Sequence, residues 1–239
     1  MADIQLTAAD GHRFSAYRAD PTGPPEGGVV VVQEIFGVNR HIRSVVDRFA
    51  DEGFVAVAPA LFDRIERGVE LGYDLDSAVK GVDLAWERLP LDDAVADASA
   101  TVGALADELV GAGTVGVVGF CYGGMLAAAL ASRSPRNLAA AVAYYPSRAA
   151  NLLTDDVPEV ALMVHLGDQD EGVTPADGRT LAERWPEATF HRYASAGHGF
   201  NCELRDSFDP EASALAWQRT VDHFGQHLST PPPPDAGAR

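Results

Sequence analysis

A cysteine stands at the centre of a glycine-rich turn in this sequence. Residues 114–125 read Thr-Val-Gly-Val-Val-Gly-Phe-Cys-Tyr-Gly-Gly-Met, an apolar run that leads into Gly-x-Cys-x-Gly and then into an Ala- and Leu-rich segment. The pattern predicts a buried strand, a sharp turn and a helix, which is the arrangement of a nucleophile elbow with Cys121 in place of serine. The amides that begin the helix would favour a thiolate and a developing oxyanion. The alternative interpretation is a turn that only packs, around a small buried cysteine.

A thiol nucleophile needs a base, and the base needs a group that orients it. His198 lies in a Gly-His-Gly segment, a loop flexible enough to turn an imidazole towards a cleft. Asp168 and Asp170 both follow the apolar run 160–166, and either could be the orienting acid. The order nucleophile, acid, histidine along the chain is the order of an α/β-hydrolase. The residues therefore predict a triad of Cys121, His198 and one of these two aspartates.

A carboxylate, Glu34, follows the strongly apolar run 29–32. Burying a carboxylate is costly unless it is paired or protonated, so an exposed strand end is the simple interpretation. The functional interpretation is an acid or base near Cys121 that accepts a hydrogen bond from the thiol and keeps it unreactive until substrate displaces the carboxylate. The backbone amides of Ile35 and Tyr122 are then the natural donors of an oxyanion hole.

The rest of the chain alternates between strand and helix patterns. An Asp-Gly turn at residues 10–11 predicts a hairpin near the N-terminus. Residues 60–90 are the least regular part, where we expect a loop or cap with a short helix near 75–89. Glu34, Cys121, Asp170 and His198 all fall at or just after strand ends, where sites form in parallel sheets. Further strands are expected at 54–58, 139–145 and 189–193, and further helices at 42–49, 91–110, 178–185 and 210–228.

Length and composition indicate one α/β domain, with a mostly parallel central sheet and helices on both of its faces. The domain is expected to span residues 1–228, and the tail 229–239, with four consecutive prolines, is expected to be disordered. A formal net charge of −17 argues against nucleic acid and anionic membranes as partners. With no signal peptide or membrane segment visible, we expect a cytoplasmic protein. Its two cysteines form no disulfide framework or metal-binding spacing, so we expect no metal.

Four segments together resemble the dienelactone hydrolase (carboxymethylenebutenolidase) family. They are Gln-Glu-Ile-Phe-Gly-Val-Asn at 33–39, Gly-Phe-Cys-Tyr-Gly-Gly at 119–124, Gly-Asp-Gln-Asp at 167–170 and Gly-His-Gly-Phe at 197–200, in collinear order. The resemblance implies an α/β-hydrolase fold and a cofactor-free monomer. It also implies a Cys-His-Asp triad in which Asp170 is the acid, and a role for Glu34 in control of the thiol.

The resemblance breaks down at substrate recognition. Family members that act on dienelactone use arginines to hold its carboxylate, but this chain has Cys202 at one of those positions, with Arg205 shortly after. At the other it offers Val79 and Lys80, and the ammonium of Lys80 is not equivalent to a guanidinium. Cys202 is expected to fill space in the pocket wall, or else to form a reversible disulfide with Cys121.

Four residues are assigned to the substrate pocket. Trp86 and Tyr144 match pocket positions of the family, and Lys80 and Phe36 are further candidates. The sequence thus predicts a hydrolase of small esters or lactones that works through a thioester acyl-enzyme. The alternative is a redox-sensing or ligand-binding thiol protein on the same fold, without turnover. Dinucleotide binding is excluded, because the glycines around residue 119 do not form G-x-G-x-x-G.

Overall fold

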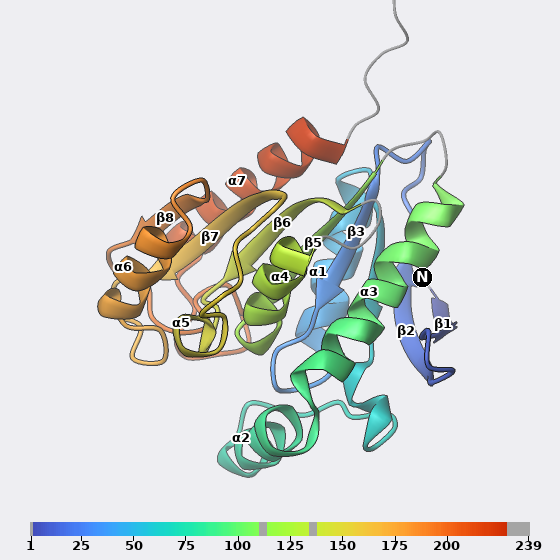
Figure 1. The fold of residues 1–239 in the computed structure, drawn as a ribbon, viewed down its shortest axis with the longest axis horizontal. Helices are drawn as coiled ribbons and strands as arrows, with labels where there is room; N and C mark the ends of the chain where they lie inside the picture. Colours follow the sequence, from blue (N-terminus) through green and yellow to red (C-terminus); the bar gives the residue numbers. More distant parts are fainter. Residues whose placement is uncertain (1, 110–113, 134–137, 229–239) are drawn as a thin grey trace, which may run out of the picture.

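A computed structural model describes residues 2–109, 114–133 and 138–228 of the chain. The tail that we expect to be disordered lies outside the described residues. Eight strands form one sheet in the order β1-β2-β4-β3-β5-β6-β7-β8 (Figure 1). The strands are β1 (Ala2–Thr7), β2 (Arg13–Ala19), β3 (Gly28–Val32), β4 (Val55–Pro59), β5 (Val115–Phe120), β6 (Leu138–Tyr144), β7 (Ala161–Gly167) and β8 (Thr189–Tyr193).

The sheet is parallel from β4 to β8. Strand β2 pairs antiparallel with both β1 and β4, so it is the one strand of the described sheet that runs in the opposite direction. Strands β1 and β2 form the predicted hairpin, in which Gly11 has a φ of 86° that favours glycine. Strands β3, β4 and β5 are buried along their whole length. Their continuous runs of valine and alanine are explained by helices on both faces of the sheet.

Helices cover both faces, as the alternating pattern predicts. Figure 1 shows α3 and α4 on one face and α1 and α7 on the other. The α/β-hydrolase architecture expected from the sequence is confirmed, with a single domain and a mostly parallel sheet. The helices are α1 (Arg40–Asp51), α2 (Leu75–Val82), α3 (Leu91–Glu108), α4 (Tyr122–Arg133), α5 (Ala149–Leu152), α6 (Pro175–Arg184) and α7 (Pro210–Leu228).

The irregular segment 60–90 forms a cap over one end of the sheet. It begins with a 3₁₀-helix, η1 (Leu61–Arg64), and ends with α2 and a π-helix, η2 (Asp83–Arg88). The expected short helix near 75–89 is therefore present, but it changes from α to π at Asp83. The Leu71 amide donates to the Phe36 carbonyl at 2.8 Å, which ties the cap to the loop after β3.

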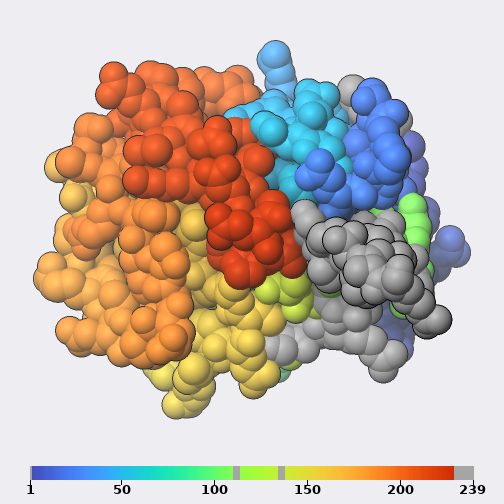
Figure 2. All heavy atoms as spheres, turned by 90° about the horizontal axis from the view of Figure 1, so that it is seen from above, coloured from blue at the N-terminus to red at the C-terminus, as the bar shows by residue number. Residues whose placement is uncertain are grey.

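Helix α7 closes the second face of the sheet beside α1. It begins as predicted, with the Asp209 carboxylate accepting from the Ala212 amide at 3.0 Å and Pro210 as its first residue. The Trp217 ring lies 4.5 Å from the Phe49 ring, and the Arg48 guanidinium lies 3.7 Å above Trp217. Figure 2 shows α7 (red) between the orange segments that precede it in the chain and the blue N-terminal segments. None of the described helices is both long and apolar enough to cross a membrane.

Candidate active site

Cys121 occupies the turn between β5 and α4, where the sequence places it. Its backbone φ of 56° lies in the left-handed region, which a non-glycine residue adopts only under the constraint of its surroundings. Gly123 permits the turn, because a Cβ there would overlap the carbonyl oxygens of Val32 and Gln33. Cys121 is buried but remains partly accessible to solvent, with 7% of the residue exposed. The geometry is that of a nucleophile elbow.

His198 and Asp170 lie together at the carboxyl edge of the sheet. The Nδ1 atom of His198 is 2.9 Å from Asp170 Oδ2 and 3.1 Å from Oδ1. Asp170 also accepts from the amides of Gly172 and Val173, at 2.7 and 2.8 Å, which fixes the carboxylate towards the ring. Asp168, the other candidate, forms an ion pair with Arg192 instead. Of the two aspartates left open by the sequence, the one in contact with His198 is Asp170.

The electrostatics of His198 connect it to Cys121. Burial alone would lower the pKa of His198, but the neighbouring Cys121 and the carboxylate of Asp170 outweigh that cost and raise the pKa to about 10. Since Nδ1 faces Asp170, the other ring nitrogen, Nε2, is left for proton transfer. The edge of the Tyr145 ring packs against the imidazole, with centroids 5.1 Å apart.

The Cys121 thiol and Glu34 have different partners from those expected. The sulfur lies 3.2 Å from the Ser147 hydroxyl oxygen, not in a hydrogen bond with Glu34. The carboxylate of Glu34 accepts from the Tyr73 hydroxyl at 3.0 Å and from the Arg205 guanidinium at 3.3 Å. Among the described residues, the structure thus shows Glu34 held by a phenol and a cation, with the thiol turned to Ser147.

Glu34 is fully buried, so its charge needs these partners. Arg205 also lies over the rings of Phe36 and Tyr73, with its guanidinium carbon 5.9 and 5.6 Å from their centroids. Its side chain is 23% exposed, so part of the guanidinium faces solvent. Asn39 donates to the Tyr73 hydroxyl at 3.2 Å and caps α1, which links the loop after β3 to the cap segment.

The two residues expected to form an oxyanion hole border the elbow. Tyr122 is the first residue of α4, where amides have no acceptor within the helix. Ile35 lies in the turn that follows β3, the strand paired with β5. Gly81 of α2 packs on this turn so closely that a Cβ there would overlap the Ile35 carbonyl oxygen.

The residues assigned to the substrate pocket divide into two groups. Phe36 borders Arg205 and Tyr73, and Trp86 packs edge-on against Tyr122 at 4.9 Å, with the Arg148 guanidinium 4.5 Å above its ring. Phe36 therefore contacts the residues that hold Glu34, and Trp86 contacts the residue that follows Cys121.

Lys80 and Tyr144 lie elsewhere. The Lys80 ammonium pairs with Glu66 at 2.6 Å on the surface. Tyr144 is fully buried, and its hydroxyl lies 2.7 Å from the Thr220 hydroxyl in α7. Tyr145, which follows the last residue of β6 and has a positive φ, is equally buried but contacts His198. The pocket assignment of Tyr144 and Lys80 stays a prediction, with the Tyr144 side chain in the core and the Lys80 side chain in a surface ion pair.

Three residues that contact the site were not found from the sequence. Ser147 follows the end of β6, a position that the strand pattern could have indicated. Tyr73 and Tyr145 carry no such signal, since one lies in the irregular cap and the other looks like a core aromatic. Tyr145 has a φ of 36°, and its buried hydroxyl has no hydrogen-bond partner among the described residues.

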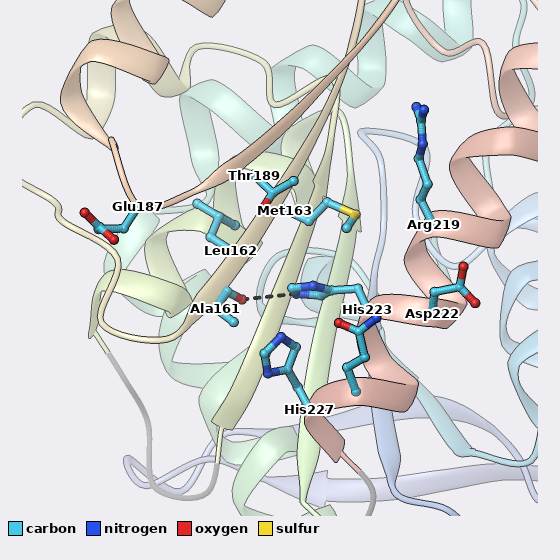
Figure 3. Close-up of a pocket in the computed structure, with 10 residues that line it drawn as sticks. Ala161, Leu162, Met163, Glu187, Thr189, Arg219, Asp222, His223 and His227 are labelled. Carbon is cyan, nitrogen blue, oxygen red and sulfur yellow. Dashed lines mark hydrogen bonds between the residues drawn. The ribbon is translucent and has the colours of Figure 1, made fainter.

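Another pocket, of about 440 Å³, lies between β7, β8 and α7 (Figure 3). It opens at Ala161 and Thr189, the first residues of β7 and β8, at the end of the sheet opposite the carboxyl edge. His223 points into it and lies 3.4 Å from the Ala161 carbonyl oxygen, and burial lowers the pKa of His223 to about 4. The size of this pocket does not make it the site, because Cys121 and His198 lie at the other end of the strands.

Proteins of one family are similar to this chain along almost its whole length. The profile of the dienelactone hydrolase family matches residues 14–228. A carboxymethylenebutenolidase of Pseudomonas putida is 31% identical over 234 residues, which cover 96% of this chain and 98% of that protein. A carboxymethylenebutenolidase of Pseudomonas sp. strain P51 is 34% identical over 225 residues, covering 92% of each chain.

Solved structures agree on the architecture. A crystal structure of a Klebsiella pneumoniae protein, 28% identical, superposes with a TM-score of 0.79 and covers 95% of this chain and 100% of that one. An α/β serine hydrolase of Xanthomonas campestris superposes with a TM-score of 0.65 at 17% identity, covering 97% and 96% of the two chains. The second comparison concerns the fold alone.

Proposed function

The chain belongs to the dienelactone hydrolase family, and from that premise we propose that it hydrolyses small esters or lactones through a thioester on Cys121. The observation that carries the proposal is the set formed by a strained elbow cysteine, His198 and Asp170 at one edge of the sheet. A thiolate beside an imidazolium is the reactive form of a cysteine nucleophile.

In the first half of the reaction, the Cys121 thiolate attacks the carbonyl carbon, and the carbonyl π electrons move to oxygen. The amides of Ile35 and Tyr122 donate to this oxyanion. Its collapse breaks the bond to the leaving alkoxide, which takes the proton from Nε2 of His198. An ester releases an alcohol at this point, whereas a lactone leaves its new hydroxyl attached to the acyl group.

In the second half, water attacks the thioester and His198 accepts its proton through Nε2. Asp170 holds Nδ1–H throughout, which fixes the ring tautomer and stabilises the imidazolium. The carbon–sulfur bond then breaks, and the acid leaves while Cys121 returns to a thiolate beside the imidazolium. No proton or electron is gained or lost by the enzyme over the cycle.

Glu34 and Arg205 are proposed to connect substrate binding to the thiol. Arg205 has five N–H donors, so it can bind a substrate carboxylate while it still contacts Glu34. Its partly exposed guanidinium beside Phe36 supports this role, and the surface ion pair of Lys80 argues against Lys80 for it. If the substrate carboxylate weakens the contact between Arg205 and Glu34, Glu34 becomes available as a second acid or base close to the elbow.

The test is turnover on a panel of dienelactone, neutral lactones and simple aryl esters. Cys121→Ala is expected to abolish turnover, and the parent is expected to gain the mass of an acyl group when a slow ester is used. His227→Gln, an exposed change at the distant pocket, serves as the control and should keep full activity. Absence of turnover by the folded parent on every panel member would contradict the proposal and favour a thiol protein without hydrolase activity.

A second measurement tests recognition of the anion. Arg205→Gln is expected to lower kcat/KM for carboxylate-bearing lactones by at least about tenfold relative to neutral esters, since hydrogen bonds to charged groups contribute about 1.5–3 kcal/mol. The ratio between the two substrate classes is the readout, because Arg205 also holds Glu34. Lys80→Gln, which removes a cation from the surface, should leave the ratio unchanged. Equal losses for both classes in Arg205→Gln would exclude Arg205 as the anchor.

A further inference from the structure

Beside the proposed catalytic pair, three buried side chains of different chemistry face one another. A carboxylate oxygen of Glu34, a ring nitrogen of His41 and the sulfur of Cys202 lie within 4.8 Å of one another. All three residues are fully buried. Glu34 comes from the loop after β3, His41 from the first turn of α1 and Cys202 from the loop that follows His198.

We propose that Glu34, His41 and Cys202 form a binding site for one thiophilic divalent cation of the Zn²⁺ class. Carboxylate oxygen, imidazole nitrogen and thiolate sulfur are the ligands that Zn²⁺ takes in proteins, at about 2.0–2.3 Å. A thiolate disfavours Mg²⁺ and Ca²⁺, which select oxygen ligands. Three protein ligands leave a fourth tetrahedral position for water.

The orientation of His41 supports a ligand at this place. Its Nδ1 lies 3.2 Å from the Glu203 carboxylate, which leaves Nε2 as the nitrogen with a free lone pair when Nδ1 carries the proton. Nε2 is buried and, apart from the Cys202 thiol that lies beside it, has no polar partner among the described residues. A histidine held by a carboxylate through one nitrogen, with the other free, is the arrangement found around metal-binding histidines.

The other two proposed ligands, Glu34 and Cys202, are also held in fixed positions by their neighbours. Tyr73 donates to one oxygen of Glu34, which restricts rotation of the carboxylate. Cys202 is fixed by a tight turn, in which its amide donates to the Gly199 carbonyl at 2.9 Å. As a ligand, Cys202 binds as a thiolate and releases its proton to solvent.

Arg205 competes with the cation for Glu34. The ion pair at 3.3 Å has to open before the carboxylate can bind a metal, and the partly exposed guanidinium can turn to solvent. Binding of a cation at this site would therefore separate Arg205 from Glu34. Its consequence for hydrolysis rests on the proposed function, but the existence of the site does not.

The experiment uses the full-length Cys121→Ala variant. Cys202 is then the only thiol of the chain, because the sequence contains two cysteines. Titration with Co²⁺ is expected to show binding of one equivalent, with a thiolate-to-metal charge-transfer band and tetrahedral d–d bands. Addition of Zn²⁺ should displace the Co²⁺ and remove these bands. A chromophoric chelator in competition measures the Zn²⁺ affinity.

Changes to two of the ligands, and to the carboxylate that contacts His41, are compared with a change to a distant histidine. In the Cys121→Ala background, Cys202→Ser and His41→Asn are each expected to weaken Zn²⁺ binding by more than about 100-fold. Glu203→Gln should weaken it by about 10–100-fold, the usual effect of losing the carboxylate partner of a ligating histidine. His227→Gln should have no effect. Circular dichroism establishes that each variant is folded, and one folded ligand variant is sufficient.

Three results would overturn the proposal. The first is the absence of a cobalt–thiolate band in Cys121→Ala at a Co²⁺ excess. The second is Zn²⁺ binding that is unchanged in His41→Asn, which would exclude His41 as a ligand. Loss of binding in His227→Gln would likewise overturn the proposal and place the ion at the α7 histidines. None of these results depends on hydrolysis, so the metal site and the proposed function can fail separately.

Discussion

The pH dependence of hydrolysis should be controlled at high pH by His198. Its pKa is raised to about 10, and the imidazolium is the acid that protonates the leaving alkoxide. The protonated form is favoured in the folded protein, so kcat/KM should hold through neutral pH and fall as the pH rises through about 10. Asp170→Asn removes one of the interactions that raise the pKa, and should move this alkaline limb to lower pH.

A neighbouring aspartate provides the control for that measurement. Asp168→Asn makes the same chemical change two residues away, but Asp168 pairs with Arg192 rather than with His198. The alkaline limb of its pH–rate profile should coincide with that of the parent. If Asp170→Asn and Asp168→Asn shift the limb equally, the carboxylate that governs His198 has been misidentified.

At the scale of single residues, the sequence indicates the groups that stand at strand ends and misses those whose place depends on tertiary contacts. Cys121, His198 and Asp170 follow recognisable strands, so their meeting at one edge could be predicted. Tyr73 and His41 could not, because one comes from an irregular cap and the other reads as a helix residue. Their contacts with Glu34 depend on the tertiary structure, which brings the loop after β3 against the cap and against the loop after His198.

At the scale of elements, the elbow depends on the absence of a side chain at Gly123. A Cβ there would overlap the carbonyl oxygens of Val32 and Gln33, at the junction of β3 and α4. Gly123→Ala should therefore lower the free energy of unfolding by about 1–3 kcal/mol, the usual cost of overpacking. Urea denaturation measures the change, and the proposed nucleophile should lose activity because its turn is displaced.

Helix α3 contains a glycine suited to the matched control. No atom lies within 4 Å of a Cβ built at Gly103, in the interior of α3. Gly103→Ala should raise the free energy of unfolding by about 0.5–1 kcal/mol, because alanine loses less backbone entropy in a helix. If Gly103→Ala also lowered the free energy of unfolding, the destabilisation by Gly123→Ala could not be attributed to close packing at the elbow.

The elements themselves were largely predictable, because each has a strong local pattern. The valine runs of β3 and β5 and the capped start of α7 needed no tertiary information. The cap was only partly predictable. The hydrophobic periodicity does not predict its change from α2 to the π-helix at Asp83. The glycine at position 81 is explained only by the close approach of the Ile35 carbonyl oxygen.

At the scale of the whole molecule, the excess of negative charge should decide how stability responds to salt. The formal net charge is −17, so many carboxylates have no cation to pair with. Their mutual repulsion destabilises the compact state, and salt screens it with a Debye length of about 10 Å at 0.1 M. The opposing effect, screening of exposed ion pairs such as Lys80–Glu66, is worth only about 0–1 kcal/mol per pair. Repulsion should therefore dominate at neutral pH.

The urea midpoint should rise at pH 7 when NaCl is increased from about 10 mM to about 150 mM, where the Debye length falls from about 30 to about 8 Å. The same titration near pH 4.6, the isoelectric point of the sequence, is the control. There the net charge is close to zero, so the repulsion is absent and salt should leave the midpoint unchanged or lower it. A midpoint that falls with NaCl at pH 7 would show that ion pairs outweigh the net charge. The stability of the fold would then depend on pairs such as the one between Arg18 and Glu108 more than their exposure suggests.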